Sequence, residues 1–250
     1  MSYQSFASFY DHLMAGAPYD QWLTYTKQKL ESRGKLIRNS AILDIGCGTG
    51  EMLVRFHAQG ANQLTGIDLS MEMLSIAREK CEQASFSPLL LQQSMAEFEA
   101  GQQFDLITIF CDSLNYLEME EEVQSTFHLL SQHLKEDGLL LFDCHSISKI
   151  EQFIGETYTD VDESVSYIWY SFAGEYDYSV EHELTFFRRG EDGRYDRFEE
   201  LHKQRTYPIK TYEKWLDDAG LKIDAVEEDF TAYQATDKSE RLFFVCLKKE

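Results

Sequence analysis

The chain has 250 residues, of which 43% are hydrophobic and 14% aromatic. A chain of this length buries roughly 70–75% of its unfolded surface, so it needs neither disulfides nor a metal to fold. It carries 44 acidic and 23 basic residues, for a net charge of −21. That charge argues against nucleic acid or an anionic membrane as the partner, because both are bound through Lys and Arg. A cationic or neutral small molecule, or a basic protein, remains compatible; alternatively, the acidity only maintains solubility.

The cysteines and the N-terminus predict a cytoplasmic protein. The number of cysteines is odd and none form a C-x-x-C pair, which is typical of reduced thiols; they are Cys47, Cys81, Cys111, Cys144 and Cys246. The N-terminal residues lack the long apolar run of a signal peptide. The longest apolar runs, such as Leu139–Phe142, are too short to cross a bilayer.

Apolar residues at helical spacing predict two helices before the first strand. The first carries Tyr3, Phe6, Tyr10, Leu13 and Met14, and the second carries Tyr19, Trp22, Leu23, Thr26 and Leu30. Strands are then expected at 41–45, 63–67, 88–91, 104–110 and 138–143, with helices between them. Ser70 is a good N-cap for one helix. Another is expected over Glu118–Leu134, where the helix dipole favours four glutamates in the first turn, Glu118, Glu120, Glu121 and Glu122. Such alternation predicts a parallel sheet covered on both faces.

After Cys144 the pattern changes to alternating stretches rich in Tyr, Phe, Glu and Asp, at 166–172, 178–187 and 195–205. They predict an antiparallel subsheet inserted into the α/β domain. A helix over Tyr212–Ala219, capped by Thr211, and strands at 221–230 and 242–247 complete the core. The expected fold is therefore a Rossmann-like, doubly wound α/β domain with a mostly parallel seven-stranded sheet. Its parts are an N-terminal helical cap (1–35), a core (36–145 and 208–250) and an inserted lid (146–207).

The segment Ile42–Gly50 carries the most informative motif. A strand runs into a G-x-G-x-G turn and then a helix, so that a ligand can approach bare backbone and the free N–H groups of the helix start. Asp68 follows at the end of the next strand, where an acid suits the two hydroxyls of a ribose. Asp44, inside the first strand, needs polar partners, and amides of the loop could supply them. A tight turn without a ligand is the alternative.

The sequence LDIGCGTG followed by GIDLS resembles motif I and its successor in class I S-adenosylmethionine-dependent methyltransferases. The wider pattern, including FASFYDHLM, FDLITIFCDSLNYL, GLLLFDCHS and SERLFFVCLK, is similar to bacterial methyltransferases of the small-molecule type over essentially the whole chain. More distantly, the insertion resembles those of glycine and amino-sugar N-methyltransferases. Motif I is specific for the superfamily and not for a substrate.

This resemblance implies S-adenosylmethionine as the cofactor and S-adenosylhomocysteine as the product. It places five residues around the methionine part of the cofactor: Asp44, Gly46, Cys47, Gly48 and Gly50. Asp68 would bind the ribose, and Leu69 and Met73 would flank the adenine. Ser94 stands where relatives often have an acid for the adenine amino group, and the backbone of Met95 could serve instead. Cys111 and Asp112 would border the methyl group and the acceptor, while Tyr10 would close over the cofactor.

Three side chains are candidates for a base that deprotonates the acceptor. Asp112 could equally cap the following turn, and His145 could satisfy a backbone group. For His182, a solvated strand face is the favoured interpretation. Five aromatic residues could form a wall for a cationic acceptor or simply pack the insertion: Tyr167, Trp169, Tyr170, Tyr176 and Tyr178. The cysteines at strand ends, Cys47, Cys111 and Cys144, are expected to be buried small residues rather than a thiol cluster or metal site.

The sequence therefore predicts methyl transfer to a small-molecule amine or hydroxyl by a monomer or homodimer. The fourth strand ends in Cys-Asp-Ser-Leu-Asn-Tyr, not in the Pro-Pro-aromatic motif of enzymes that methylate nucleobase nitrogens. A nicotinamide-dependent oxidoreductase would need the wider G-x-G-x-x-G spacing. A cofactor-responsive, non-catalytic binding module for a basic protein is the remaining alternative.

Overall fold

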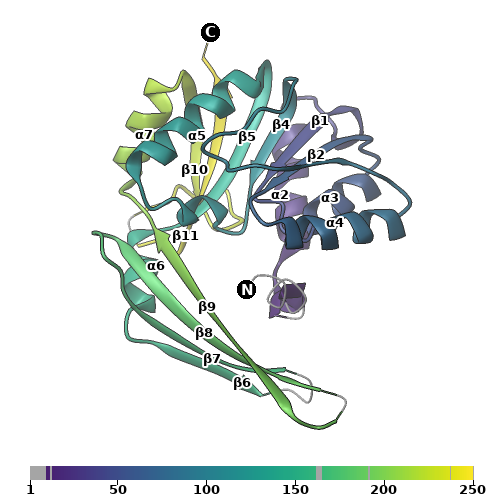
Figure 1. Cartoon of the computed structure of the whole chain (residues 1–250). Helices are drawn as coiled ribbons and strands as arrows, with labels where there is room; N and C mark the ends of the chain where they lie inside the picture. The colour runs from purple at the N-terminus through teal and green to yellow at the C-terminus, as the bar shows by residue number, and fades with distance from the viewer. Residues whose placement is uncertain (1–9, 12, 162–164, 191, 237, 250) are drawn as a thin grey trace.

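The computed structural model describes residues 10–11, 13–161, 165–190, 192–236 and 238–249. It contains a seven-stranded sheet flanked by helices and a separate four-stranded antiparallel sheet, which lies below the first in Figure 1. The first expected helix falls mostly outside the described residues, and Met14–Gly16 form a short 3-10 turn (η1). The second expected helix is α2, Tyr19–Glu31, followed by a second 3-10 turn (η2, Ile37–Asn39).

The large sheet has the order β10-β11-β5-β4-β1-β2-β3, which confirms the expected Rossmann-like architecture. Its strands are β1 (Ala41–Ile45), β2 (Gln63–Asp68), β3 (Leu89–Gln92), β4 (Phe104–Ile109), β5 (Leu134–His145), β10 (Leu221–Glu228) and β11 (Arg241–Lys248). The first five pair in parallel, and β11 runs antiparallel to both β5 and β10. Parallel pairing brings the carboxyl ends of β1, β2, β4 and β5 to one edge of the sheet, where ligands bind in such folds.

Besides α2, the described helices that accompany this sheet are α3 (Glu51–Ala58), α4 (Met71–Gln83), α5 (Glu120–His133) and α7 (Ile209–Asp218). Ser70 caps α4 as expected, since its hydroxyl accepts the N–H of Met73. Two helix starts were wrong. Helix α5 begins at Glu120, so that Glu118 precedes it, and α7 begins at Ile209, directly after Pro208, rather than at Tyr212 after a Thr211 cap. A proline can stand at a helix start because it has no N–H to leave unpaired.

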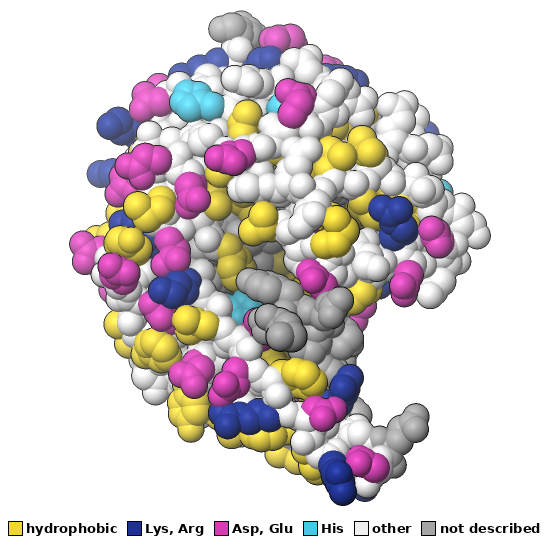
Figure 2. Space-filling view, in the orientation of Figure 1, with side chains coloured by type: hydrophobic (Ala, Val, Ile, Leu, Met, Phe, Trp, Pro, Cys, Tyr) yellow, Lys and Arg dark blue, Asp and Glu magenta, His cyan; other side chains and the backbone are white. Residues whose placement is uncertain are grey.

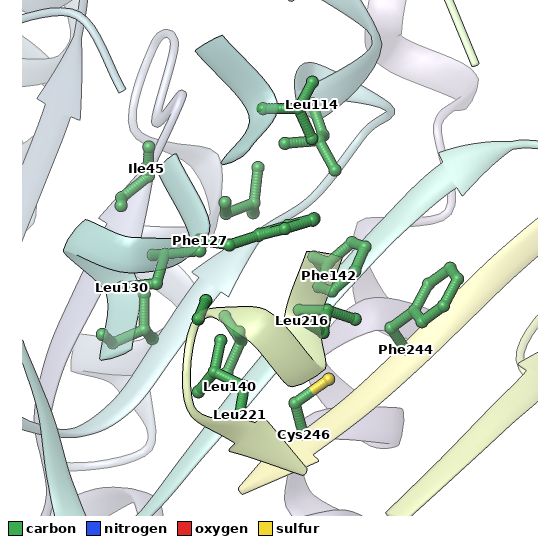
Figure 3. Packing of buried hydrophobic residues seen from close by; sticks show 14 of the residues in the cluster. Ile45, Leu114, Phe127, Leu130, Leu140, Phe142, Leu216, Leu221, Phe244 and Cys246 are labelled. Carbon is green, nitrogen blue, oxygen red and sulfur yellow. The ribbon is translucent and has the colours of Figure 1, made fainter. Parts of the chain in front are cut away.

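Two apolar clusters account for the burial of both faces of the large sheet. One holds α5 and α7 against the sheet and includes Phe142 and Phe244, whose rings stack at 4.5 Å (Figure 3). The other packs α2 and α3 against the opposite face through residues such as Trp22, Phe56 and Phe243. The functional edge is therefore held by strands that cannot shift without disturbing a packed core.

The four-stranded sheet has the order β6-β7-β8-β9, formed by Thr157–Val161, Val165–Ala173, Ser179–Arg189 and Tyr195–Arg205. A short helix, α6 (Ile147–Phe153), precedes it. The sequence did not predict α6 or β6, because α6 buries only Ile150 and every residue of β6 is exposed. Figure 2 shows that the molecule is hollowed between the large body and the far end of this small sheet. Among the described residues, no helix is long and apolar enough to cross a membrane.

Candidate active site

The loop after β1 has a backbone that only glycine adopts without strain. Gly46, Gly48 and Gly50 have φ values of +66°, +51° and +81°. A Cβ at Gly46 would lie 2.8 Å from the Cβ of Ser113, and one at Gly50 would lie 3.1 Å from the Cβ of Ala77. At Gly48 the nearest atom would be a ring carbon of Tyr10, at 4.0 Å. The loop is thus packed tightly on both flanks and open at its centre.

Asp68 is bound to this loop by its carboxylate. Its Oδ2 accepts the N–H of Gly48 at 2.8 Å, and its Oδ1 accepts the N–H of Ser70 at 2.9 Å. Burial raises the pKa of Asp68, although these amides partly offset the effect. Each carboxylate oxygen can accept a second hydrogen bond. Asp68 therefore fits a ligand that presents two adjacent hydroxyls, as a ribose does.

Asp44 obtains its partner from a neighbouring strand and not from the loop. The hydroxyl of Thr108 donates to Oδ1 at 2.7 Å. The loop amides of Cys47, Gly48 and Gly50 bond elsewhere, so the expectation that the loop pairs with Asp44 was wrong. Burial raises the pKa of Asp44 to about 7, against the lowering effect of the Thr108 hydrogen bond.

A pocket lies directly beside the glycine loop. Its walls include six residues named from the sequence: Tyr10, Asp44, Gly46, Cys47, Gly48 and Cys111. They also include five that the sequence reasoning missed: Tyr19, Thr49, Glu51, Met52 and Phe110. Tyr19 and Met52 showed only the helical spacing of core residues, which carries no sign of a pocket.

Of the remaining residues expected at the cofactor, one reaches the glycine loop and three lie elsewhere or bond within their own turn. Met95 reaches the loop, with its methyl carbon 3.9 Å from where a Cβ of Gly46 would lie. Met73 is buried in a cluster that also contains Tyr10 and Val165 of the small sheet. Leu69 is exposed, and the hydroxyl of Ser94 accepts the N–H of Ala96 in its own turn.

The start of the described chain is fastened to the glycine loop. Thr49 donates its hydroxyl to Asp11 at 2.5 Å, and the ammonium of Lys80 contacts Asp11 at 2.8 Å and Glu51 at 2.5 Å. Tyr10, beside Gly48, is partly buried, and desolvation raises the pKa of its phenol. These contacts fix Asp11 beside the loop, and the neighbouring Tyr10 lines the pocket.

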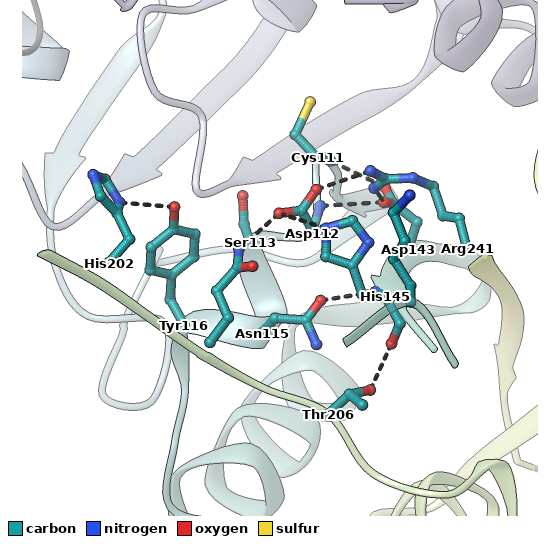
Figure 4. Close-up of polar contacts among 12 residues, drawn as sticks. Cys111, Asp112, Ser113, Asn115, Tyr116, Asp143, His145, His202, Thr206 and Arg241 are labelled. Carbon is teal, nitrogen blue, oxygen red and sulfur yellow. Dashed lines mark hydrogen bonds and ion pairs between the residues drawn. The ribbon is translucent and has the colours of Figure 1, made fainter. Parts of the chain in front are cut away.

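The turn after β4 is held in an unusual conformation by one carboxylate. Cys111 and Asp112 have φ values of +55° and +50°, which residues other than glycine rarely adopt. Their N–H groups donate to the two oxygens of Asp143, at 3.0 and 3.1 Å (Figure 4). Asp143 also accepts the indole N–H of Trp22 at 2.9 Å and pairs with Arg241. The sequence reasoning missed Asp143, although a carboxylate within an apolar strand is a signal that polar partners must exist.

Asp112 and His145 face one another at this edge (Figure 4). The Asp112 carboxylate is bound by Arg241 at 3.0 Å, by the amide of Gln204 at 2.8 Å and by Nε2 of His145 at 3.4 Å. Burial alone would raise the pKa of Asp112, but His145 and Arg241 outweigh it and hold that pKa well below its usual value. No side-chain hydrogen bond from Asp112 caps the turn that follows it.

Both backbone groups of His145 are hydrogen-bonded, whereas one of its ring nitrogens has no partner within the described residues. Its N–H donates to Asn115 at 2.8 Å, and its carbonyl accepts the hydroxyl of Thr206 at 2.6 Å. The ring meets Phe153 edge to face, with centroids 5.3 Å apart. Within the described residues Nδ1 has no hydrogen-bond partner, although it is buried. The ring therefore does not serve a backbone group, which was the alternative role considered for it.

The expectation that His182 lies on a solvated strand face was wrong. The residue is 3% exposed, and its Nδ1 accepts the indole N–H of Trp169 at 2.9 Å. Burial lowers the pKa of His182 to about 4.

The five aromatic residues expected to form a wall do not share one face of the small sheet. Trp169 points to the same face as His182, whereas Tyr170 lies on the opposite face and is 51% exposed. Of the other three, Tyr167 belongs to the apolar cluster with Phe186, Tyr178 is exposed, and Tyr176 stacks on Arg205.

The cysteines at the strand ends do not come together as ligands. Cys144 and Cys47 are buried in different apolar clusters, on opposite faces of the sheet. The thiol of Cys47 points toward Gly66, where a Cβ would lie 2.8 Å from its sulfur. In the part of the chain that the structure describes, no three His, Cys, Asp or Glu side chains are arranged to hold a metal ion.

A glycine-rich loop after β1, an acid at the end of β2 and a polar turn after β4, all on one edge of a seven-stranded sheet, define a class I S-adenosylmethionine-dependent methyltransferase. The family model "Methyltransferase domain" matches residues 42–138. The chain is 48% identical to "Putative methyltransferase GWCH70_2453" of Geobacillus sp. (strain WCH70), over 99% of this chain and 100% of that one. The chain belongs to this methyltransferase family, and its cofactor is S-adenosylmethionine.

Two further relatives are informative. The crystal structure of an S-adenosylmethionine-dependent methyltransferase from Clostridium acetobutylicum ATCC 824 superposes with a TM-score of 0.86 at 29% identity, covering 99% of each chain. The dTDP-3-amino-3,6-dideoxy-alpha-D-glucopyranose N,N-dimethyltransferase of Streptomyces fradiae is 25% identical over 74% of this chain and 71% of that one.

Proposed function

We propose that this methyltransferase acts on the nitrogen of a small-molecule amine, with His145 as the base; a hydroxyl acceptor is the alternative. The observation that carries the base assignment is the buried Nδ1 of His145, which has no hydrogen-bond partner among the residues that the structure describes. The amine is favoured because the Streptomyces fradiae relative is named for N-methylation of an amino sugar. The net charge of −21 also suits a substrate that arrives as an ammonium ion.

The residues around the glycine loop fit the cofactor. Bound S-adenosylmethionine supplies a methyl group on a sulfonium, which is already activated for transfer. The Asp68 carboxylate accepts backbone N–H groups and keeps acceptor capacity for a ribose hydroxyl, and the open centre of the loop at Gly48 leaves backbone accessible. Tyr10, held by the contacts of Asp11, covers the pocket and excludes water.

His145 and Asp112 divide the remaining work. Asp112 is a poor proton acceptor at neutral pH, because its pKa is held low by His145 and Arg241 despite its burial. Its contact with Nε2 of His145 favours the tautomer that carries the proton on that nitrogen. Nδ1 then offers its lone pair to the proton that leaves the acceptor nitrogen. The Asp112 carboxylate stabilises the imidazolium that results.

We also propose the division into an N-terminal cap (1–35), a core (36–145 and 208–250) and a lid (146–207). Trp169 and His182 on the small sheet lie near His145, with Phe153 packed between the His145 and His182 rings. The lid therefore borders the space beside His145, while Tyr10 and Tyr19 of the cap line the pocket at the glycine loop.

Release of S-adenosylhomocysteine in the presence of a panel of amines and matched alcohols would test this function. We expect turnover with amines, and a loss of about 100-fold or more in kcat for His145→Gln near pH 7. Raising the pH should rescue His145→Gln for an amine, because the free amine then forms without a base. The proposal fails if His145→Gln keeps its kcat at neutral pH, or if only alcohols are methylated.

A further inference from the structure

A continuous chain of hydrogen bonds runs from the small sheet to the turn after β4. The indole N–H of Trp169 on β7 donates to Nδ1 of His182 on β8, at 2.9 Å. The hydroxyl of Ser171 contacts the same nitrogen at 2.8 Å. His182 also forms a side-chain hydrogen bond with Gln204 on β9. The amide of Gln204 then donates to Oδ2 of Asp112 at 2.8 Å.

The direction of every bond in this chain follows from its first member. An indole N–H can only donate, so Nδ1 of His182 carries no proton and the neutral ring holds its proton on Nε2. That proton is donated to the carbonyl oxygen of Gln204. The amide nitrogen of Gln204 is then left to face Asp112, where a carboxylate requires a donor. This arrangement satisfies the contacts of Trp169, Gln204 and Asp112, while the Ser171 hydroxyl shares the single lone pair of His182 Nδ1 with the indole N–H.

The end of β9 makes further contacts with the same edge of the large sheet. The carbonyl of Arg205 accepts the amide N–H of Asn115 at 2.8 Å, and Thr206 donates to the carbonyl of His145 at 2.6 Å. Gln204 itself is 4% exposed. The Asp112 oxygen that it contacts is also the one nearest His145. The orientation of the Asp112 carboxylate therefore depends on the position of β9, because Gln204 on this strand binds it.

We propose that Gln204 is a positioning residue that couples docking of the small sheet to the alignment of Asp112 with His145. This inference rests on the proposed function for its catalytic consequence, but the hydrogen-bond chain can be tested without any acceptor. When β9 is docked, Arg241, Gln204 and His145 fix the Asp112 carboxylate. When β9 is displaced, the hydrogen bond from Gln204 is lost and Asp112 can rotate away from His145. The contact between Asp112 and His145 would then form only when the small sheet is docked. Docking also protects the acceptor from water.

The three tryptophans of the chain provide the readout. In a 1H–15N spectrum of the cofactor-free protein, each indole gives one signal, assigned by Trp→Phe variants. Gln204→Met keeps the length of the side chain and removes both hydrogen bonds. We expect the Trp169 indole signal to shift and its hydrogen to exchange at least about tenfold faster. The signal of Trp22, which is bound to Asp143, should stay in place.

A matched control lies one residue away. Lys203 points to the opposite face of β9, where it pairs with Glu181 at 3.1 Å, so Lys203→Gln should leave the Trp169 signal unchanged. In the wild-type protein, long-range 15N–1H correlation should show the His182 proton on Nε2, a result that does not depend on the folding of any variant. A proton on Nδ1 of His182, or a Trp169 signal indifferent to Gln204→Met, would overturn the proposal.

Kinetics separate this inference from the proposed function. With an amine substrate, Gln204→Met should lower kcat while leaving the affinity for S-adenosylmethionine within about twofold, because Gln204 does not line the cofactor pocket. An unchanged kcat would refute the coupling even if the indole signal moves. If the wild type methylates no amine, the proposed function fails, while the indole experiment still decides whether the chain of hydrogen bonds exists.

Discussion

Asp143 accepts the backbone N–H of Asp112 at 3.1 Å, and this contact lets a strand residue set the conformation of the turn after β4. The same carboxylate binds Cys111, Trp22 and Arg241, and it is fully buried. Burial raises the pKa of Asp143, against the attraction of Arg241. The turn after β4 is therefore stabilised by the buried carboxylate of Asp143, which itself depends on several partners.

Asp143→Asn should destabilise the protein by about 3–5 kcal/mol, because an amide offers one acceptor oxygen where two are used and leaves Arg241 without its closest counter-charge. Urea denaturation followed by circular dichroism would measure the change in free energy of unfolding. Arg194→Gln is the matched control, since its side chain is 89% exposed, and it should change stability by no more than about 0.5 kcal/mol. Equal effects of the two substitutions would contradict this account of Asp143.

Asp68→Asn should weaken binding of S-adenosylmethionine and S-adenosylhomocysteine by about 10- to 100-fold, the usual value of hydrogen bonds to a charged group. The asparagine also places its NH2 group against one of the two backbone N–H donors, of Gly48 or of Ser70, which then loses its acceptor. Isothermal titration calorimetry would measure the change, with Glu72→Gln on the neighbouring helix as the control. Binding of NAD with similar affinity would conflict with the cofactor assignment.

Gly46→Ala should destabilise the protein more than Gly101→Ala, although the two glycines have similar φ values of +66° and +70°. A Cβ at Gly101 meets nothing within 4 Å, so only the backbone cost of about 1–2 kcal/mol applies. At Gly46 the new methyl also collides with Ser113. Adding Ser113→Gly to Gly46→Ala should recover the difference, as measured by thermal or urea unfolding. A double variant no more stable than Gly46→Ala would show that the contact is not the cause.

Asp44→Asn should stabilise the cofactor-free protein at alkaline pH and not in acid. Burial raises the pKa of Asp44 from 3.8 to about 7, so the folded state binds a proton that the unfolded state has lost between these values. Stability of the wild type is therefore lost as the pH rises from about 4 to 7, and the penalty is complete above 7. Urea denaturation at pH 5 and pH 8 should show the advantage of Asp44→Asn growing with pH. An advantage independent of pH would contradict the raised pKa.

Several parts of the molecule could be read from local sequence pattern. The apolar strands around Ile42 and Leu106, the capping serine at 70, and the order of glycine loop, helix and Asp68 each depend on residues close together in the chain. Periodic burial and loop conformation leave a local signature, because the sheet requires apolar side chains on both faces and the turn requires positive φ. These patterns were enough to predict the fold and the cofactor loop.

The edge of the sheet around Asp112 and His145 depends on contacts between distant residues. Asp143 and Arg241 are 98 positions apart, Gln204 and Asp112 are 92 apart, and both pairs meet only because β11 and β9 return to the edge formed by β4 and β5. His182 alternates with glutamates along β8, a pattern typical of a solvated face, yet packing of the small sheet against the core buries it. A side chain's polarity is visible in the sequence. Which partner that side chain meets depends on the topology, because the order of the strands determines which distant residues lie close together. The sequence alone does not give that order.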